Sequence, residues 1–264
     1  MKHIARKRFG QNFLHDQQVI NRIISRFHPQ NGQSIVEIGP GLGALTWPLL
    51  DQVDTLHAVE LDRDLVARFE ADPRASGRLH IHQHDALKFD FSTLVNPPDK
   101  LRIIGNLPYN ISTPLLFHLM KFAPFIQDMM FMLQKEVVER ITAGPGVKNY
   151  GRLSVILQAQ CRVEKILDVS RGSFSPPPKV DSAVVQLIPH TIPVIDLPDH
   201  EIFDRIVKAS FSQRRKTLRN TLKGLLTEIQ ITACLLYTSP SPRDKIHDLV
   251  CRLLREKGGG GGGG

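Results

Sequence analysis

The sequence is poor in cysteine: it has three cysteines in 264 residues, and no two of them form a CxxC pair. No set of Cys and His residues has the spacing of a zinc site, so we expect no structural metal. No apolar run reaches the roughly 18 to 20 residues that a membrane-spanning helix needs. The N-terminus also lacks the apolar segment of a signal peptide. These absences predict a reduced, cytoplasmic protein without a metal or a membrane segment.

Positive charge, in contrast, is abundant. The chain has 34 Lys and Arg against 26 Asp and Glu, a formal net charge of +8, and a pI of about 9.6. Residues 1–232 alone, with 29 basic and 23 acidic side chains, keep a net charge of +6. Such an excess attracts phosphate groups at a distance and replaces their counterions on contact. The charge therefore favours an anionic partner, although many basic proteins bind no nucleic acid.

The composition changes near the C-terminus. Residues 236–244 resemble translated sequencing-adapter sequence, and residues 258–264 are a glycine homopolymer that cannot form a core. One interpretation is that residues 233–264 are a non-native tail. The other is a genuine polar loop followed by a short amphipathic helix.

Four apolar segments are each followed by glycines or a polar side chain, which predicts strands of a parallel sheet. They cover residues 34–38, 56–59, 79–82 and 101–104. Gly39, Gly41 and Gly43 follow the first segment and let the backbone approach a ligand closely. Glu60, 21 residues after Gly39, can accept hydrogen bonds from ribose hydroxyls, and Asp85 can receive an adenine amino group. The pattern predicts a nucleoside-containing ligand at one edge of the sheet.

The fourth segment runs into Asn106-Leu107-Pro108-Tyr109. The exocyclic amine of adenine is a poor nucleophile because its lone pair is delocalised into the ring, and acceptors aimed at its N–H bonds draw that pair out of conjugation. Asn106 supplies a side-chain carbonyl, and the carbonyl of Leu107 is held outward because a residue before proline favours extended geometry. Tyr109 offers a stacking face. We interpret this stretch as an amino-methylation site.

Two alternatives stay open at this point. The stretch could be an ordinary Asn-x-Pro turn after a strand. A nicotinamide enzyme could share the glycine loop and Glu60, but that function would leave the four residues from Asn106 to Tyr109 without a role.

Six segments occur together and in one order. They are Gln11-Asn12-Phe13-Leu14, Glu37-Ile38-Gly39-Pro40-Gly41, Glu60-Leu61-Asp62, Asp85-Ala86, residues 105–112 (Gly-Asn-Leu-Pro-Tyr-Asn-Ile-Ser) and residues 174–182 (Phe-Ser-Pro-Pro-Pro-Lys-Val-Asp-Ser). From about residue 7 to residue 225, the chain resembles the ribosomal RNA small-subunit adenine dimethyltransferase family. The resemblance implies an α/β fold: a Rossmann-like class I methyltransferase sheet with flanking helices, followed by a small C-terminal α-helical domain. We expect the methyltransferase domain in residues 1–190, the start of the helical domain in residues 200–232, and the atypical tail in residues 233–264.

The resemblance also implies roles for individual residues. Contacts to S-adenosylmethionine would come from Asn12, Leu14, Gly39, Gly41, Glu60, Asp85 and Asn106. Asn106, Leu107 and Tyr109 would address the target adenine, with Phe174 stacked on its other side. Without the resemblance, Phe174 would be expected to be a core aromatic residue, because buried phenylalanine is so common.

The implied function is transfer of methyl groups from S-adenosylmethionine to N6 of two adjacent adenosines near the 3′ end of small-subunit (16S) rRNA, with a role in subunit maturation. The partners would be the small ribosomal subunit and its rRNA, and the chain would act as a monomer without a metal. Alternatives are a large-subunit rRNA adenine methyltransferase, a non-catalytic RNA-binding assembly factor, and a DNA adenine methyltransferase.

Basic residues supply the candidate RNA contacts. They lie at the N-terminus, in a Gly-rich loop and beside the apolar face of a C-terminal helix: Arg6, Lys7, Arg8, Arg152, Arg214, Arg215, Lys216 and Arg219. A solvated charged surface is the alternative for each of them.

Overall fold

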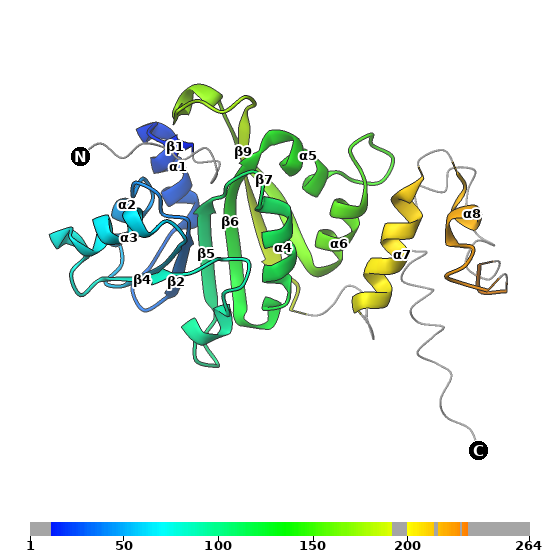
Figure 1. Ribbon diagram of the computed structural model, residues 1–264, viewed down its shortest axis with the longest axis horizontal. Coiled ribbons are helices and arrows are strands. Elements are labelled where there is room, and N and C mark those ends of the chain that lie inside the picture. Colours follow the sequence, from blue (N-terminus) through cyan, green and yellow to red (C-terminus); the bar gives the residue numbers. More distant parts are fainter. Residues whose placement is uncertain (1–11, 192–199, 214–215, 228, 232–264) are drawn as a thin grey trace, which may run out of the picture. The chain divides into compact units, whose positions relative to one another are not determined.

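The computed structural model describes residues 12–191, 200–213, 216–227 and 229–231, which pack as two compact units (Figure 1). Of these residues, the first unit holds 12–138 and 163–189, and the second holds 139–162 and those from 190 onward. The division falls after Pro189, next to the predicted boundary at residue 190, but the second unit also includes residues 139–162, which were predicted to belong to the methyltransferase domain. Residues 139–162 belong to the second unit because their helix packs against a helix of the C-terminal segment.

A seven-stranded sheet with the order β4-β3-β2-β5-β6-β9-β7 forms the centre of the first unit. The strands β2 to β6 pair in parallel, and β9 runs antiparallel to β6. Their bounds are β2 (Ser34–Ile38), β3 (Leu56–Glu60), β4 (Leu79–Gln83), β5 (Leu101–Asn106), β6 (Ile126–Gln134), β7 (Cys161–Val169) and β9 (Ser182–Pro189). The four predicted strands coincide with β2 to β5, so the expected α/β fold is confirmed.

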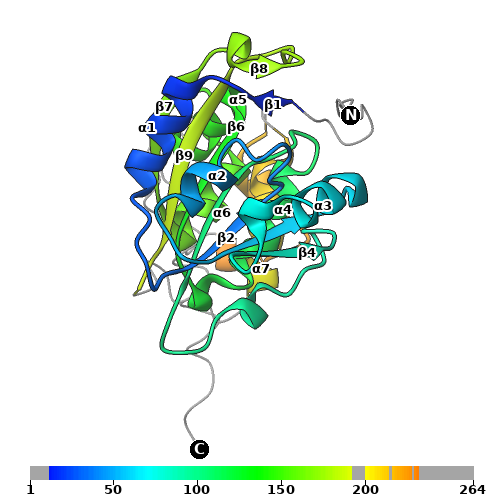
Figure 2. The same cartoon turned by 90° about the vertical axis from the view of Figure 1, so that its left-hand side faces the viewer.

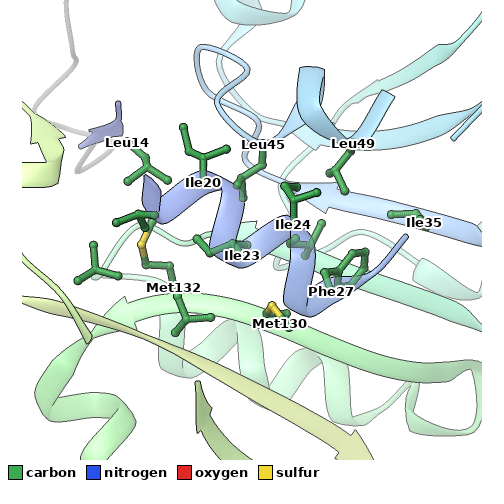
Figure 3. Packing of buried hydrophobic residues seen from close by; sticks show 14 of the residues in the cluster. Leu14, Ile20, Ile23, Ile24, Phe27, Ile35, Leu45, Leu49, Met130 and Met132 are labelled. Atoms are coloured by element: carbon green, nitrogen blue, oxygen red, sulfur yellow. The ribbon is translucent and has the colours of Figure 1, made fainter. Parts of the chain in front are cut away.

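Helix α1 (Gln17–Phe27) shows how the sequence builds the core. Asp16 caps its start by accepting hydrogen bonds from the backbone N–H groups of the first turn. Apolar residues at every third or fourth position form one buried face. This face packs against β2, β6 and α2 with the residue before it (Figure 3). The cluster includes Ile20, Ile23, Ile24, Phe27, Ile35, Leu45, Leu49, Met130 and Met132.

Four further helices each follow a strand of the sheet, and the division between the two units falls within the last of them. They are α2 (Thr46–Leu50), α3 (Arg63–Glu70), α4 (Ser112–Met120) and α5 (Lys135–Thr142), with 3-10 turns at Pro73–Ala75, Phe91–Leu94, Ala123–Phe125 and Arg171–Ser173. Figure 2 shows α1 and α4 on opposite faces of the sheet. Both faces of the parallel strands are therefore covered, as apolar strands of this kind require.

A separate two-stranded sheet joins the N-terminal segment to a late one. Strand β1 (Phe13–Leu14) pairs antiparallel with β8 (Phe174–Ser175). The backbone N–H of His15 donates to the carbonyl of Ser173 at 3.0 Å, and the Ser173 hydroxyl donates to Asp16 at 2.9 Å. These bonds fix the segment that precedes α1.

The second unit contains α6 (Arg152–Gln160), α7 (His200–Ser212) and α8 (Leu218–Leu222). The Arg152 guanidinium pairs with the carboxylate of Asp204 at 2.7 Å and so joins α6 to α7. Within the described ranges of the chain, no helix is long and apolar enough to cross a membrane, and no three His, Cys, Asp or Glu side chains gather where they could hold a metal ion.

Candidate active site

A cavity of about 310 Å³ lies in the first unit, at the carboxyl ends of β2, β3 and β5. It is lined by every residue predicted to contact the cofactor: Asn12, Leu14, Gly39, Gly41, Glu60, Asp85 and Asn106. Leu107 and Tyr109, which were predicted to address the target amine, line the same cavity. Residues from distant parts of the sequence meet there because parallel strands end at one edge of the sheet.

The loop after β2 forms one wall of the cavity. Gly39 and Gly41 have φ angles of +69° and +58°, in the left-handed region where a side chain is strained. A Cβ atom on Gly41 would lie 3.2 Å from the ring of Phe13. The loop can therefore turn tightly and present its backbone to a ligand.

Glu60 ends β3 and is held by three backbone donors. Its carboxylate accepts hydrogen bonds from the N–H groups of Leu61 at 2.8 Å, Asp62 at 2.9 Å and Gly41 at 3.3 Å. Burial raises the pKa of Glu60, and these hydrogen bonds oppose the rise. The carboxylate is fixed at the strand end, in the place where it can accept hydrogen bonds from ribose hydroxyls.

Glu37 is a second buried carboxyl group in the cavity wall, and the sequence analysis gave it no role. The Thr46 hydroxyl donates to it at 2.6 Å. Burial raises the pKa of Glu37 to about 8; the bond from Thr46 lowers the pKa, and the nearby Glu60 charge raises it further. Glu37 is a charged residue inside the otherwise apolar end of β2, two residues before Gly39, and this is the signal that could have identified it.

Apolar side chains line the cavity together with the half-buried Asp85. The Asp85 carboxylate accepts a hydrogen bond from the N–H of Leu87 at 3.0 Å. Leu61, which is 50% exposed, lines the cavity together with Ala86. An exposed leucine beside a strand-terminal acid suits a flat apolar ring, and the sequence analysis missed it because single apolar residues outside a periodic pattern carry little signal.

Asn106 ends β5, where two backbones approach closely. A Cβ atom on the preceding Gly105 would lie 2.5 Å from the carbonyl oxygen of Ile38, so only glycine fits there. The side-chain amide of Asn106 donates a hydrogen bond to the backbone carbonyl of Asn12 at 3.0 Å. This bond orients the amide so that its oxygen is the group that can accept a hydrogen bond from a ligand.

Tyr109 is anchored at its hydroxyl. The phenol oxygen lies 2.7 Å from the hydroxyl oxygen of Ser182, the first residue of β9. Burial raises the pKa of Tyr109, although the bond to Ser182 lowers it. The phenol is therefore neutral at physiological pH, and its ring forms part of the cavity wall.

Phe174 does not line the cavity in this structure. Its side chain is 3% exposed and belongs to the hydrophobic cluster that includes Leu14, its partner across β1 and β8. The stacking role that the family resemblance implies stays a prediction, whereas this buried position is the one expected from composition. The physical reason is the β1–β8 pairing, which turns the ring toward the core.

The candidate RNA contacts are less fully described. Arg152 is ion-paired with Asp204, whereas Lys216 and Arg219 are exposed in the second unit. Arg6, Lys7, Arg8, Arg214 and Arg215 lie outside the described residues. Only three of the eight predicted RNA contacts lie in the described part of the chain, so the set stays a prediction.

Comparisons with known proteins agree on one family. A sequence model described as "Ribosomal RNA adenine dimethylase" matches residues 2–237. Proteins named "Ribosomal RNA small subunit methyltransferase A" are similar to this chain. The one from Thiobacillus denitrificans is 59% identical over 225 residues, covering 85% of this chain and 86% of that protein. The one from Pseudomonas fluorescens is 55% identical over 232 residues, covering 88% and 86%.

Solved structures show the same fold. A dimethyladenosine transferase from Plasmodium falciparum superimposes with a TM-score of 0.72 at 28% identity, over 93% of this chain and 97% of that one. The 23S rRNA methyltransferase ErmE shares the fold, with a TM-score of 0.68 at 23% identity. The sheet of this chain and its similarity to these proteins establish a class I methyltransferase fold. The chain therefore belongs to the ribosomal RNA adenine dimethylase family.

Proposed function

We propose that the protein transfers methyl groups from S-adenosylmethionine to N6 of two adjacent adenosines near the 3′ end of small-subunit (16S) rRNA, giving N6,N6-dimethyladenosine. One observation carries the proposal. Asn106, whose amide is oriented by Asn12, lies at the edge of the cavity that Gly39, Glu60 and Asp85 also line. An acceptor for an amine thus adjoins a set of groups suited to a nucleoside.

The residues of the cavity fit the parts of the cofactor. Leu61 and Ala86 can cover the adenine while Asp85 receives its amino group, and the fixed carboxylate of Glu60 can accept the ribose hydroxyls. The backbone of the glycine loop and Glu37 line the part of the cavity next to them. When bound, S-adenosylmethionine supplies a methyl group on a positively charged sulfur, which is a good leaving group.

The protein's own contribution is to orient the target amine. The Asn106 oxygen and the Leu107 carbonyl can accept the two N6 hydrogens, which draws the nitrogen lone pair out of conjugation and toward the methyl group. Tyr109 can stack on a base that has left its helix. A strong general base is unnecessary because N6 becomes positively charged, and so acidic, once the new bond has formed. The rate enhancement therefore comes mainly from position and orientation.

Two further roles belong to this proposal. Phe174 would have to turn out of the hydrophobic cluster to stack on the second face of the base. Lys216 and Arg219, with the basic residues outside the described ranges, would neutralise RNA phosphates. The names of the 55% to 59% identical relatives favour the small subunit over the large one as the substrate.

The experiment is methyl transfer from labelled S-adenosylmethionine to small ribosomal subunits that lack adenine dimethylation, followed by digestion and nucleoside analysis. We expect N6,N6-dimethyladenosine with wild-type protein, and none with Asn106→Ala. Asn21→Ala, a change on the exposed side of α1, is the matched control and should behave as wild type. Large subunits and DNA serve as competing substrates, and label appearing in either of them would contradict the proposed target.

A further inference from the structure

Ser182 lies at the edge of the sheet where the cavity is, although it is the first residue of its strand. Strands β2 to β5 bring their carboxyl ends to this edge, and β9 runs antiparallel to its neighbour β6. In the register, Asn106 pairs with Met132 and Gln134 pairs with Ser182. The first residue of the antiparallel strand is thereby brought close to the last residues of the parallel ones.

The Ser182 hydroxyl is buried and turned toward the cavity wall. The side chain is 0% exposed, and its oxygen lies 2.7 Å from the Tyr109 phenol. A buried hydroxyl without a hydrogen bond costs free energy, so this contact stabilises both groups. The apolar residues Ala183, Val184 and Val185 follow in β9, so the serine is a buried polar residue directly before an apolar run.

Both partners of this bond have independent supports. The carbonyl of Asp181 accepts a hydrogen bond from the N–H of Lys135 at 3.0 Å, which fixes the start of β9. The hydroxyl of Ser112 donates to the backbone carbonyl of Tyr109 at 3.0 Å, which fixes the loop. The Ser182 contact then determines where the far end of the ring lies.

We propose that Ser182 is a positioning residue for the methyl-transfer reaction: by holding the Tyr109 hydroxyl, it fixes the plane of the ring on which the target base stacks. This inference rests on the proposed function. A tyrosine ring attached only at its Cβ can rotate about two side-chain bonds. A hydrogen bond at the opposite end of the ring removes that freedom.

The anchor matters most for the second methyl transfer. An unmodified N6 has two hydrogens for the Asn106 and Leu107 acceptors, whereas a monomethylated N6 has one. The stacking ring therefore carries a larger share of the positioning in the second step. Loss of the anchor should let monomethylated product accumulate.

The test is a double-mutant cycle with single-turnover rates for each of the two transfers. Ser182→Ala and Tyr109→Phe each remove one partner of the bond and leave the stacking ring in place. We expect each variant to slow the second transfer about threefold to tenfold, the range of one hydrogen bond, and the first transfer less. The double variant should be no slower than either single one, because both changes remove the same bond.

Ser112→Ala is the matched control, since it also removes a buried serine hydroxyl that contacts Tyr109, but through the backbone. Its effect should add to that of Tyr109→Phe and should not change the ratio of monomethyl to dimethyl product. Additive effects of Ser182→Ala and Tyr109→Phe, or an unchanged second rate in Ser182→Ala, would overturn the inference.

A second measurement does not depend on activity. The chain has three tyrosines, Tyr109, Tyr150 and Tyr237. With the latter two changed to phenylalanine and the remaining ring labelled with carbon-13, the resonance of the carbon bearing the hydroxyl reports the hydrogen bond of Tyr109. It should shift in Ser182→Ala and not in Ser112→Ala. If that shift occurs but wild-type protein makes no dimethyladenosine, the bond is real and the proposed function is wrong; absence of the shift overturns the inference alone.

Discussion

The two ends of the cavity are built in different ways. At the cofactor end, the groups come from consecutive strand ends, and Glu60 is held by N–H groups close to it in sequence or on the neighbouring loop. At the amine end, Asn106 and Tyr109 are held by Asn12 and Ser182, which lie 94 and 73 residues away. Local sequence therefore determines the cofactor end, whereas the amine end depends on the completed fold. The two ends should respond differently to substitution.

Asn106→Ala should have the largest effect. Removing the acceptor should lower both methyl-transfer rates at least about a hundredfold, the order seen when one transition-state hydrogen bond is deleted. Binding of S-adenosylmethionine should weaken far less, because Glu60 and Asp85 remain. Single-turnover rates and calorimetric binding of the cofactor check this. Near-normal formation of monomethyladenosine would contradict the proposed role of Asn106. It would also contradict the distinction between the two ends of the cavity.

Glu60→Ala should show the opposite pattern. Loss of a charged acceptor for the ribose should weaken cofactor binding about tenfold to a hundredfold, since such hydrogen bonds contribute about 1.5 to 3 kcal/mol. The rate at saturating cofactor should change little. Calorimetry and rates over a range of cofactor concentrations separate the two quantities. A fall in the saturated rate that matches the fall in affinity would show that the two ends are not independent.

Glu37 predicts a pH dependence of stability. Burial raises its pKa in the folded protein to about 8, above the ordinary glutamate value of 4.5. The folded state then binds more protons than the unfolded state between these values, so the free energy of unfolding should fall as pH rises from about 4.5 to about 8. The contribution is at most about 1.4 kcal/mol per pH unit.

Glu37→Gln should flatten this dependence in urea unfolding measured across that window, because glutamine does not titrate. Glu70→Gln, at the exposed end of α3, is the matched control. An equal slope in wild type and Glu37→Gln would exclude Glu37 as the source.

Gly41→Ala should have the smallest effect. Its φ of +58° and the Phe13 ring 3.2 Å from the new Cβ predict a cost of about 1 kcal/mol, or about a fivefold loss of cofactor affinity. Gly77→Ala is the control, because Gly77 has a similar φ of +70° but no atom within 4 Å of a new Cβ. Gly77→Ala should lower the stability of the protein and leave its affinity for the cofactor unchanged. Equal cofactor affinity in both variants would show that the strain at Gly41 does not affect cofactor binding.

The same difference between the two ends of the cavity decides which of its residues could be predicted from the sequence. Apolar runs followed by glycine or acid identified β2 to β5, and the parallel arrangement then placed Glu60, Asp85 and Asn106 at one edge. Ser182 was not identified, because nothing local indicates that an antiparallel strand will bring it to the Tyr109 hydroxyl. The orientation of Phe174 likewise depends on pairing with Leu14, and a pairing between such distant segments leaves no periodic signal.

The pairing of β1 with β8 has a consequence for the order of events during synthesis. Leu14 cannot pair with Phe174 until the ribosome has added the 160 residues that lead to Phe174. An emerging chain would already carry the glycine loop, Glu60 and Asn106, but the segment that orients Asn106 would still lack its partner strand. The closed cavity is therefore among the last parts of the first unit to form, since contacts between distant segments form slowly. A nascent chain would acquire its binding site only when almost all of that unit had left the ribosome.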